Sequence, residues 1–207
     1  MLIPFANLVA KYNIRGGKIL HIGAHHCEEM TDYAAHGYDD SRVVWLEGSP
    51  ATAQEAKKMY PGAEIYSAVV SDRDNQEVEL ILTNNGQSSS ILELDEHKKE
   101  HPWVWETGRV RLRTVTVDSL FRMFNINPSQ FHFLNMDIQG AELLPLKGMS
   151  SVLPYIKYAY LEVNEKHLYK DCALMPEIDA FLGRYGFVRE ETAMTQYGWG
   201  DAFYVKH

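Results

Sequence analysis

Short apolar segments alternate with helical patterns along this 207-residue chain, and that alternation constrains the fold more than any other feature. Each apolar segment has the length of one strand, and the helical patterns between them suit crossover helices. Such alternation is typical of βαβ units, so it predicts an α/β fold with a mostly parallel, doubly wound sheet. We expect strands at 18–22, 42–46, 63–70, 77–82, 110–117, 131–136 and 156–163, and helices at 1–12, 28–36, 50–60, 118–124, 141–146 and 175–185.

The remaining segments complete this picture. Residues 84–108 fit neither pattern and are expected to form a loop or a broken helix. Two last strands, at 187–190 and 202–205, follow one another without a full crossover helix, so they are expected to pair antiparallel. No linker or internal repeat interrupts the chain, which predicts a single domain over residues 1–207.

Composition narrows the classes of partner. The net charge of −8 disfavours nucleic acid, because phosphate backbones are held mainly by Lys and Arg. No apolar run reaches the roughly 18 residues that a membrane span needs, and residues 1–17 lack the order of a signal peptide. Cys27 and Cys172 do not form a disulfide framework, so we expect free thiols and a cytoplasmic protein.

Three arginines alternate along one expected strand, at Arg109, Arg111 and Arg113. Alternate residues of a strand share one face, so these side chains form a row. A solvated strand face is favoured over a local patch for RNA.

Sheets of this kind bind ligands at the carboxyl ends of their strands, so the residues that follow each strand are the candidates for a site. Gly23, Ala24 and His25 follow the first strand, where a glycine lets the backbone approach a ligand closely. Glu47 follows the second strand, 24 residues after Gly23, at the spacing of an acid that binds a ribose diol. Together, Gly23 and Glu47 favour a nucleoside-binding site over the alternative, in which Gly23 only forms a turn and Glu47 only faces solvent.

The third strand end carries Ser67, Ala68 and Val69, whose small groups suit the edge of a base. Asp137 follows the apolar strand at 131–136. A carboxylate that emerges from a buried strand is costly unless it is paired or functional, so Asp137 is the main candidate for a catalytic residue.

Further candidates lie beyond these positions. Glu162 and Asn164 stand at the end of the strand expected at 156–163, and they are expected to act in catalysis and in substrate binding respectively. Ser89, in the serine run of the 84–108 segment, suits a polar lid over the substrate, since no GxSxG surrounds it. Trp199 precedes the last strand and is a candidate for substrate binding, whereas Trp103 and Trp105 suit either sugar binding or anchoring of the loop.

Four stretches of the chain resemble the FkbM family of S-adenosylmethionine-dependent methyltransferases. They are HIGAHHCEE at 21–29, VVWLEGSP at 43–50, FLNMDIQGAELLPLKGM at 133–149 and GWGDAFYVK at 198–206. The resemblance implies a class I (Rossmann-like) methyltransferase fold and O-methyl transfer, often to sugars or hydroxylated natural products. It also implies that Gly23 and its neighbours lie near the methionine part of the cofactor, Glu47 on the ribose and Asp137 beside the transferred methyl group.

The expected reaction needs alignment and a base. Alignment of the donor with a hydroxyl is mainly a proximity effect, and a positioned general base removes the proton. Asp137 is the first candidate for the base, with Glu162 in the same role or orienting the substrate. An alternative way to lower the pKa of the hydroxyl is a bound Mg²⁺ ion, for which Asp137 and Glu162, with Asn164 nearby, would be suitable oxygen ligands. The expected partner is a small-molecule or glycan acceptor.

Three other functions stay open from the sequence. A nicotinamide-dependent oxidoreductase would use the same sheet, but the GxGxxG fingerprint is missing. A non-catalytic nucleoside-binding domain would hold the cofactor without transfer. An RNA methyltransferase is disfavoured by the acidic balance of the chain.

Overall fold

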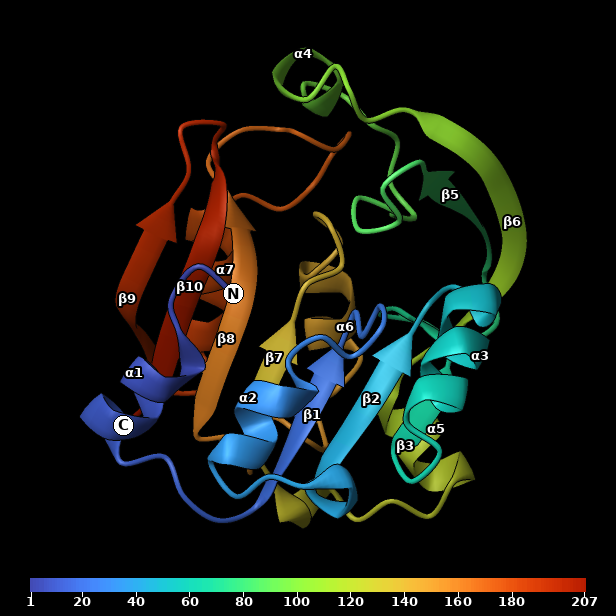
Figure 1. Ribbon diagram of the computed structural model, residues 1–207. Coiled ribbons are helices and arrows are strands. Elements are labelled where there is room, and N and C mark those ends of the chain that lie inside the picture. Colours follow the sequence, from blue (N-terminus) through green and yellow to red (C-terminus); the bar gives the residue numbers. More distant parts are fainter.

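A computed structural model describes residues 1–207 as a large central sheet, its covering helices and a second, smaller sheet above it (Figure 1). The large sheet has seven strands in the order β3-β2-β1-β7-β8-β10-β9. These strands are β1 (Lys18–Ile22), β2 (Val43–Glu47), β3 (Glu64–Ser67), β7 (Phe131–Met136), β8 (Tyr158–Asn164), β9 (Phe187–Met194) and β10 (Trp199–Lys206).

Strand direction confirms the predicted doubly wound sheet. β3, β2, β1, β7 and β8 pair in parallel, whereas β10 pairs antiparallel with both β8 and β9. The chain order reverses beside β1, since β2 lies on one side of it and β7 on the other. That reversal is the point at which sheets of this type bind ligands.

Each face of the large sheet is covered by its own hydrophobic core. Because side chains alternate along a strand, Leu20 and Ile22 of β1 pack on one face while Ile19 packs on the other. One core holds the helices α5 (Val117–Met123), α6 (Leu143–Lys147) and α7 (Met175–Gly183), and the opposite core holds α1 (Phe5–Tyr12), α2 (Met30–Ala35) and α3 (Pro50–Met59). Short 3₁₀ turns, η1 (Asp40–Arg42) and η2 (Pro128–Gln130), lead into β2 and β7. None of the helices has the length and apolar character that crossing a membrane would require.

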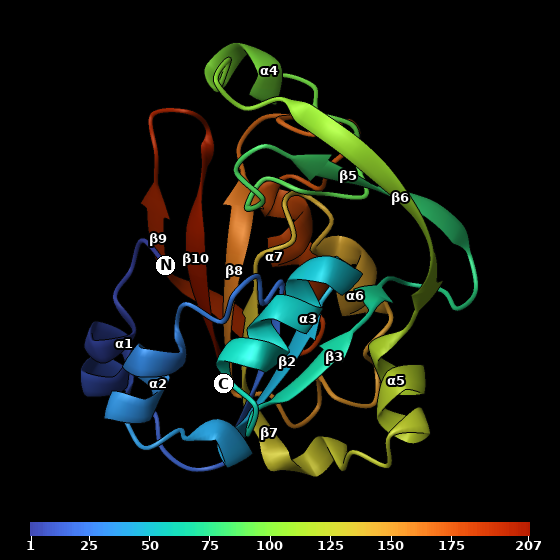
Figure 2. The same ribbon diagram turned by 45° about the vertical axis from the view of Figure 1, so that its right-hand side comes forward.

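A separate three-stranded sheet arches over the carboxyl ends of the large one (Figures 1 and 2). Its order is β4-β6-β5, and its elements are β4 (Val69–Val70), β5 (Glu77–Thr83), the short helix α4 (His97–Glu100) and β6 (Glu106–Val115). We call residues 77–115 the lid. The segment expected to be a loop, 84–108, is therefore the tip of this lid and contains both α4 and the start of β6.

Two expected elements differ in the structure. The first helix begins at Phe5 rather than at Met1, because Pro4 stands before the first turn and residues preceding a proline favour an extended backbone. The expected strand at 63–70 is divided. β3 stays in the large sheet, the Ala68 N–H donates to the Glu47 carbonyl at 2.8 Å, and β4 then joins the lid sheet.

Other boundaries shift by a few residues. The helix expected at 28–36 begins at Met30, because His25 and Cys27 have left-handed backbones. The cap of α5 is Thr116, whose hydroxyl accepts from the Ser119 N–H at 3.1 Å, so this helix begins at Val117 rather than at Asp118. Both closing strands are longer than predicted, since β9 and β10 pair along most of their length.

The central strand β7 provides a test of this packing. Leu134 is fully buried in the larger core, so Leu134→Ala should lower the free energy of unfolding by about 2–5 kcal/mol, measured by urea denaturation. The matched control is Met123→Ala at the end of α5, where the side chain is 69% exposed and the change should stay within about 0.5 kcal/mol. Equal effects of the two substitutions would contradict the assigned core.

Candidate functional site

The turn after β1 is fitted closely against the end of β7. Gly23 has a φ of +90°, and a Cβ atom there would lie 1.8 Å from the Asp137 carbonyl oxygen. The Asp137 N–H in turn donates to the Ile22 carbonyl at 2.9 Å. Only glycine satisfies both the left-handed backbone and this contact. The two strand ends that the sequence singled out are thus adjacent in space.

Glu47 is held at the end of β2 by two backbone donors. Its carboxylate accepts from the His25 N–H at 2.8 Å and from the Ser49 N–H at 2.7 Å. Burial raises the pKa of Glu47, and these two N–H groups oppose the rise by stabilising the charged form. A carboxylate fixed in this way keeps further lone pairs for the hydroxyl groups of a ligand.

A small cavity of about 80 Å³ lies beside Glu47. Gly23, His25, Glu47, Ala68, Val69 and Ser89 are among the residues that line it. Ala24 is buried below the turn and does not line it, and Ser67 is exposed outside it. Ser89, expected on the substrate side, lies instead on this side, because its hydroxyl accepts from the Thr83 N–H of β5 at 3.2 Å.

A larger cavity of about 540 Å³ adjoins the small one. Gly23, His25, Gln87, Asp137 and Gln139 line both, so the two form one continuous site under the lid. Glu162 and Trp199 line the large cavity. Its wall contains no Lys or Arg but five acids, Glu28, Glu29, Asp137, Glu162 and Asp201.

Asp137 and Glu162 share one amide donor at the floor of the large cavity. The Gln139 side-chain nitrogen donates to Asp137 Oδ1 at 2.6 Å and to Glu162 Oε2 at 2.5 Å. Burial, and next the negative charge of Asp137, raise the pKa of Glu162 well above its ordinary value. The surroundings of Glu162 therefore favour the protonated form of its carboxyl group.

Two further acidic or amide residues at the strand ends, Asn164 and Glu142, line neither cavity. Asn164 is fully buried at the end of β8, lines neither cavity, and has no hydrogen-bond partner for its side-chain amide. The candidate role of Asn164 in substrate binding is thus not reflected in its position. Glu142 accepts from the Ile138 and Gly140 N–H groups at 3.0 and 3.2 Å, and burial raises its pKa to about 7. It braces the turn between β7 and α6.

Several residues of the site were not assigned from the sequence. His21 and Asn135 both hydrogen-bond the Tyr33 hydroxyl beneath the large cavity, and burial lowers the pKa of His21 to about 3. Asp201 accepts from the Leu2 N–H and from the Tyr160 hydroxyl, and it lies opposite Glu162 in the β8–β10 register. That register comes from pairing between distant segments, so no local pattern could have revealed it.

The lid closes the large cavity from above. The Lys166 ammonium, just beyond β8, contacts Glu100 of α4 at 2.5 Å, and the Asp95 N–H donates to the Leu168 carbonyl at 2.9 Å. His97, His101 and Trp103 of the lid line the cavity, whereas Trp105 does not. His97 is buried and burial lowers its pKa to about 4, so this imidazole is neutral near pH 7.

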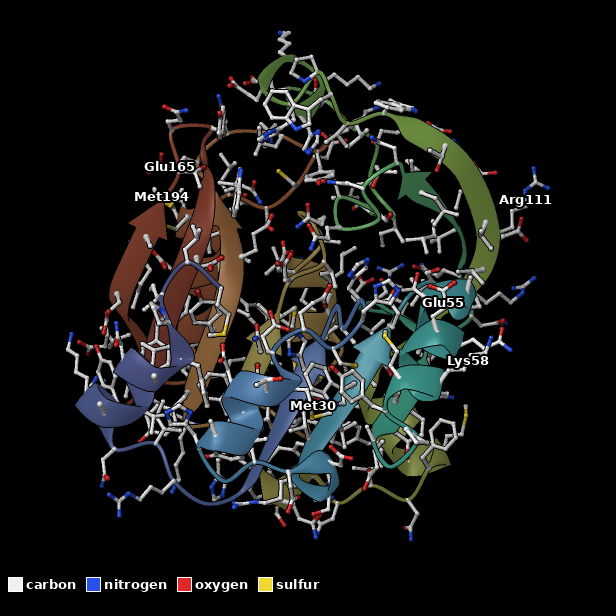
Figure 3. The ribbon with its side chains drawn as sticks, viewed as in Figure 1. Met30, Glu55, Lys58, Arg111, Glu165 and Met194 are labelled. Carbon is white, nitrogen blue, oxygen red and sulfur yellow. The ribbon has the colours of Figure 1, made fainter.

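The arginine row on β6 faces away from the site. Figure 3 shows Arg111 projecting outward from the lid strand. Arg109 contacts Glu93 at 2.6 Å and Glu106 at 2.7 Å, and Arg111 contacts Glu79 at 3.2 Å. These arginines are paired with acids of the lid, in keeping with the expected solvated strand face.

One group of side chains has the spacing of metal ligands. His25, His26 and Glu28 place their ligand atoms within 4.8 Å of one another at the rim of the site. Two of those atoms already have partners, since His25 bonds Glu28 at 2.5 Å and His26 bonds Glu55 at 3.0 Å. Between Asp137 and Glu162, the Gln139 amide nitrogen lies within hydrogen-bond distance of both carboxyl groups.

Comparison with known proteins agrees with this geometry. A family model described as the methyltransferase FkbM domain matches residues 21–189. The methyltransferase FkbM from Methylobacillus flagellatus KT superposes with a TM-score of 0.57 at 15% identity, over 94% of this chain and 45% of that one. No curated protein sequence matches.

Two further solved structures share the fold. A S-adenosylmethionine-dependent methyltransferase from Clostridium acetobutylicum ATCC 824 gives a TM-score of 0.52 at 6% identity, over 99% of this chain and 90% of that one. Sp1610 of Streptococcus pneumoniae, a candidate tRNA (m1A22) methyltransferase solved in complex with S-adenosyl-L-methionine, gives 0.52 at 13% identity over 97% and 71%. The sheet is therefore that of a class I methyltransferase, and the chain belongs to the FkbM family of S-adenosylmethionine-dependent methyltransferases.

Proposed function

We propose that this methyltransferase acts on a hydroxyl group of a neutral sugar, glycan or hydroxylated natural product. The observation that carries the proposal is Glu162, a buried carboxylate beside Asp137 in the cavity that adjoins the Glu47 cavity. An alcohol is a poor acid, so its methylation requires a base near the attacking oxygen. A carboxyl group with a raised pKa is better matched to that task than an ordinary surface acid.

The residues around the small cavity fit the nucleoside part of the cofactor. Glu47 would accept hydrogen bonds from the ribose hydroxyls, and Ala68 and Val69 would contact the base. The cavity is smaller than the roughly 300 Å³ of typical ligand sites, so entry requires the lid residues 86–91 to move outward. Gly23 and His25 line the passage toward Asp137, where the methionine part would lie.

The bound cofactor would supply an electrophilic methyl group on a sulfonium. The hydroxyl oxygen would attack the methyl carbon, and the carbon–sulfur bond would break. Asp137 would lie beside that methyl group, and its negative charge complements the positive sulfur. Glu162 would take the hydroxyl proton. Desolvation under the closed lid strengthens both interactions, since water screens charges less in an enclosed site.

The charges of the large cavity support a neutral acceptor. Five carboxyl groups and no Lys or Arg line it, so a phosphate or carboxylate on the acceptor would be repelled without compensation. Carboxylates are also good acceptors for sugar hydroxyls. An RNA substrate has little to support it, because the arginines of β6 lie outside the site and are paired with glutamates.

Removal of the Glu47 charge should weaken cofactor binding. Glu47→Gln is expected to raise the Kd for S-adenosylmethionine about 10- to 100-fold, because hydrogen bonds to a charged group are lost, and calorimetry measures the change. Glu165→Gln is the control, since Glu165 is an exposed acid at the end of β8 that lines neither cavity (Figure 3). Unchanged affinity of Glu47→Gln would remove Glu47 from the ribose site.

Transfer of labelled methyl from the cofactor can identify the acceptor. Neutral saccharides and polyols should accept the label, whereas matched uronates and sugar phosphates should not. With an acceptor in hand, Glu162→Gln should lower kcat about 10²- to 10⁴-fold, because the base is lost. EDTA should leave the rate unchanged; a rate lost on chelation would assign proton removal to a metal instead. Label found only on nitrogen or on RNA would overturn the proposal.

The two lid tryptophans form a matched pair for testing the acceptor side. Trp103 is 56% exposed and lines the large cavity, whereas Trp105 is 58% exposed and does not. Flat aromatic faces pack against sugar rings, so Trp103→Ala should raise KM for a glycan acceptor roughly 3- to 10-fold with little change in kcat. Trp105→Ala should change neither constant. Identical behaviour of the two variants would exclude Trp103 from acceptor binding.

A further inference from the structure

Gln139 occupies a position that connects both halves of the site. Its backbone is left-handed, with a φ of +59°, and Gly140 follows with a φ of +91°. The Ser90 hydroxyl of the lid donates to the Gln139 carbonyl at 2.9 Å. A non-glycine residue adopts this backbone only when its surroundings hold it there, and such positions gather at functional sites.

The Gln139 side chain is oriented by a third residue. The Tyr169 hydroxyl donates to Gln139 Oε1 at 2.5 Å, so the amide nitrogen must face the two carboxylates. Tyr169 is buried and burial raises its pKa, which keeps its hydroxyl protonated and able to donate. The amide therefore places one N–H on Asp137 and the other on Glu162.

We propose that Gln139 is a positioning residue that holds Asp137 and Glu162 at a fixed separation and stabilises both as carboxylates. This inference rests on the proposed function. Glu162 is buried and Asp137 is exposed beside it. Two carboxylates that approach one donor repel each other when both are charged. A neutral amide that bonds to each of them favours the charged forms, which leaves Glu162 free to accept a proton and Asp137 to face the sulfonium.

The other titratable groups around Glu162 either disfavour its charged form or are neutral. Besides Asp137, the acids Glu142 at the start of α6 and Asp201 of β10 raise its pKa. Tyr169 is a neutral donor to Gln139, and His21 of β1 is neutral near pH 7. Gln139 is thus the donor that connects the two carboxylates, as Lys and Arg are absent from the cavity wall.

A glutamate at position 139 would have a different effect. Its carboxylate would meet Asp137 and Glu162 at the distances now spanned by the amide, and three adjacent acids would then repel one another when charged. The amide in this chain avoids that repulsion. Gln139→Met removes both N–H donors while keeping length, and Gln139→Glu replaces them with charge.

The test uses the full-length protein and needs no known acceptor. S-adenosylmethionine carries a sulfonium charge that S-adenosylhomocysteine lacks, so the ratio of their Kd values reports the negative charge at the methyl site. Calorimetry from pH 5 to 9 should show the preference for the charged cofactor rising with pH. In Gln139→Met the pH at which this preference is half developed, its midpoint, should move up by about one pH unit. That shift corresponds to roughly a tenfold loss of the preference near the midpoint.

Gln87→Met is the matched control. Gln87 lines both cavities but makes no side-chain hydrogen bond to either carboxylate, so its variant should keep the wild-type ratio and midpoint. A merely structural role of Gln139 would weaken both ligands equally and leave the midpoint unchanged, which would overturn the inference. If Gln139→Met lacks a cooperative unfolding transition, Gln139→Glu takes its place. The pH midpoint of the cofactor preference should then also move upward, and an unchanged midpoint would count against the inference.

Failure of this inference is distinct from failure of the proposed function. A wild-type protein that methylates a hydroxyl while Gln139→Met keeps the same midpoint would overturn only the role of Gln139. A wild-type protein that binds the cofactor but methylates no hydroxyl acceptor would overturn the proposed function.

Discussion

The contact between Gly23 and the Asp137 carbonyl determines the arrangement of this site. Any side chain at position 23 would collide with the backbone of β7, so the turn after β1 and the end of β7 can lie together only with glycine there. That approach brings the cofactor loop beside the acidic end of β7. The Glu47 carboxylate then fastens the same loop from the other side through the His25 N–H. The site is therefore built from backbone contacts before any ligand enters.

The lid turns these strand ends into an enclosed site. Its chain leaves the large sheet after β3, pairs with itself as β5 and β6, and returns to the body at α5. Contacts with the segment after β8 and with Gln139 hold its tip over the cavities. Because the lid covers both cavities, one opening movement would admit cofactor and acceptor and one closure would exclude water from both.

Acids outnumber basic side chains in the wall of the large cavity. Glu162 and Asp201 are buried there, and no Lys or Arg of the wall compensates them. Buried carboxylates without cations are costly, and a positively charged sulfonium offsets part of that cost. After methyl transfer the sulfur is neutral, so the same acids hold the product less strongly. In the proposed arrangement, the charge that positions the donor would thereby favour release of the spent cofactor.

The sequence by itself determined the doubly wound sheet, because apolar strands and crossover helices leave a periodic record in local residue order. It also located Gly23, Glu47 and Asp137, since each follows directly on an apolar strand, and the family resemblance added methyl transfer. Tertiary structure decided the rest. The pairing of Asp201 with Glu162, the burial of Asn164, the position of Ser89 in the wall of the small cavity and the amide bridge of Gln139 all depend on contacts between distant segments. Such contacts arise from strand register and from the path of the lid, which no local pattern specifies.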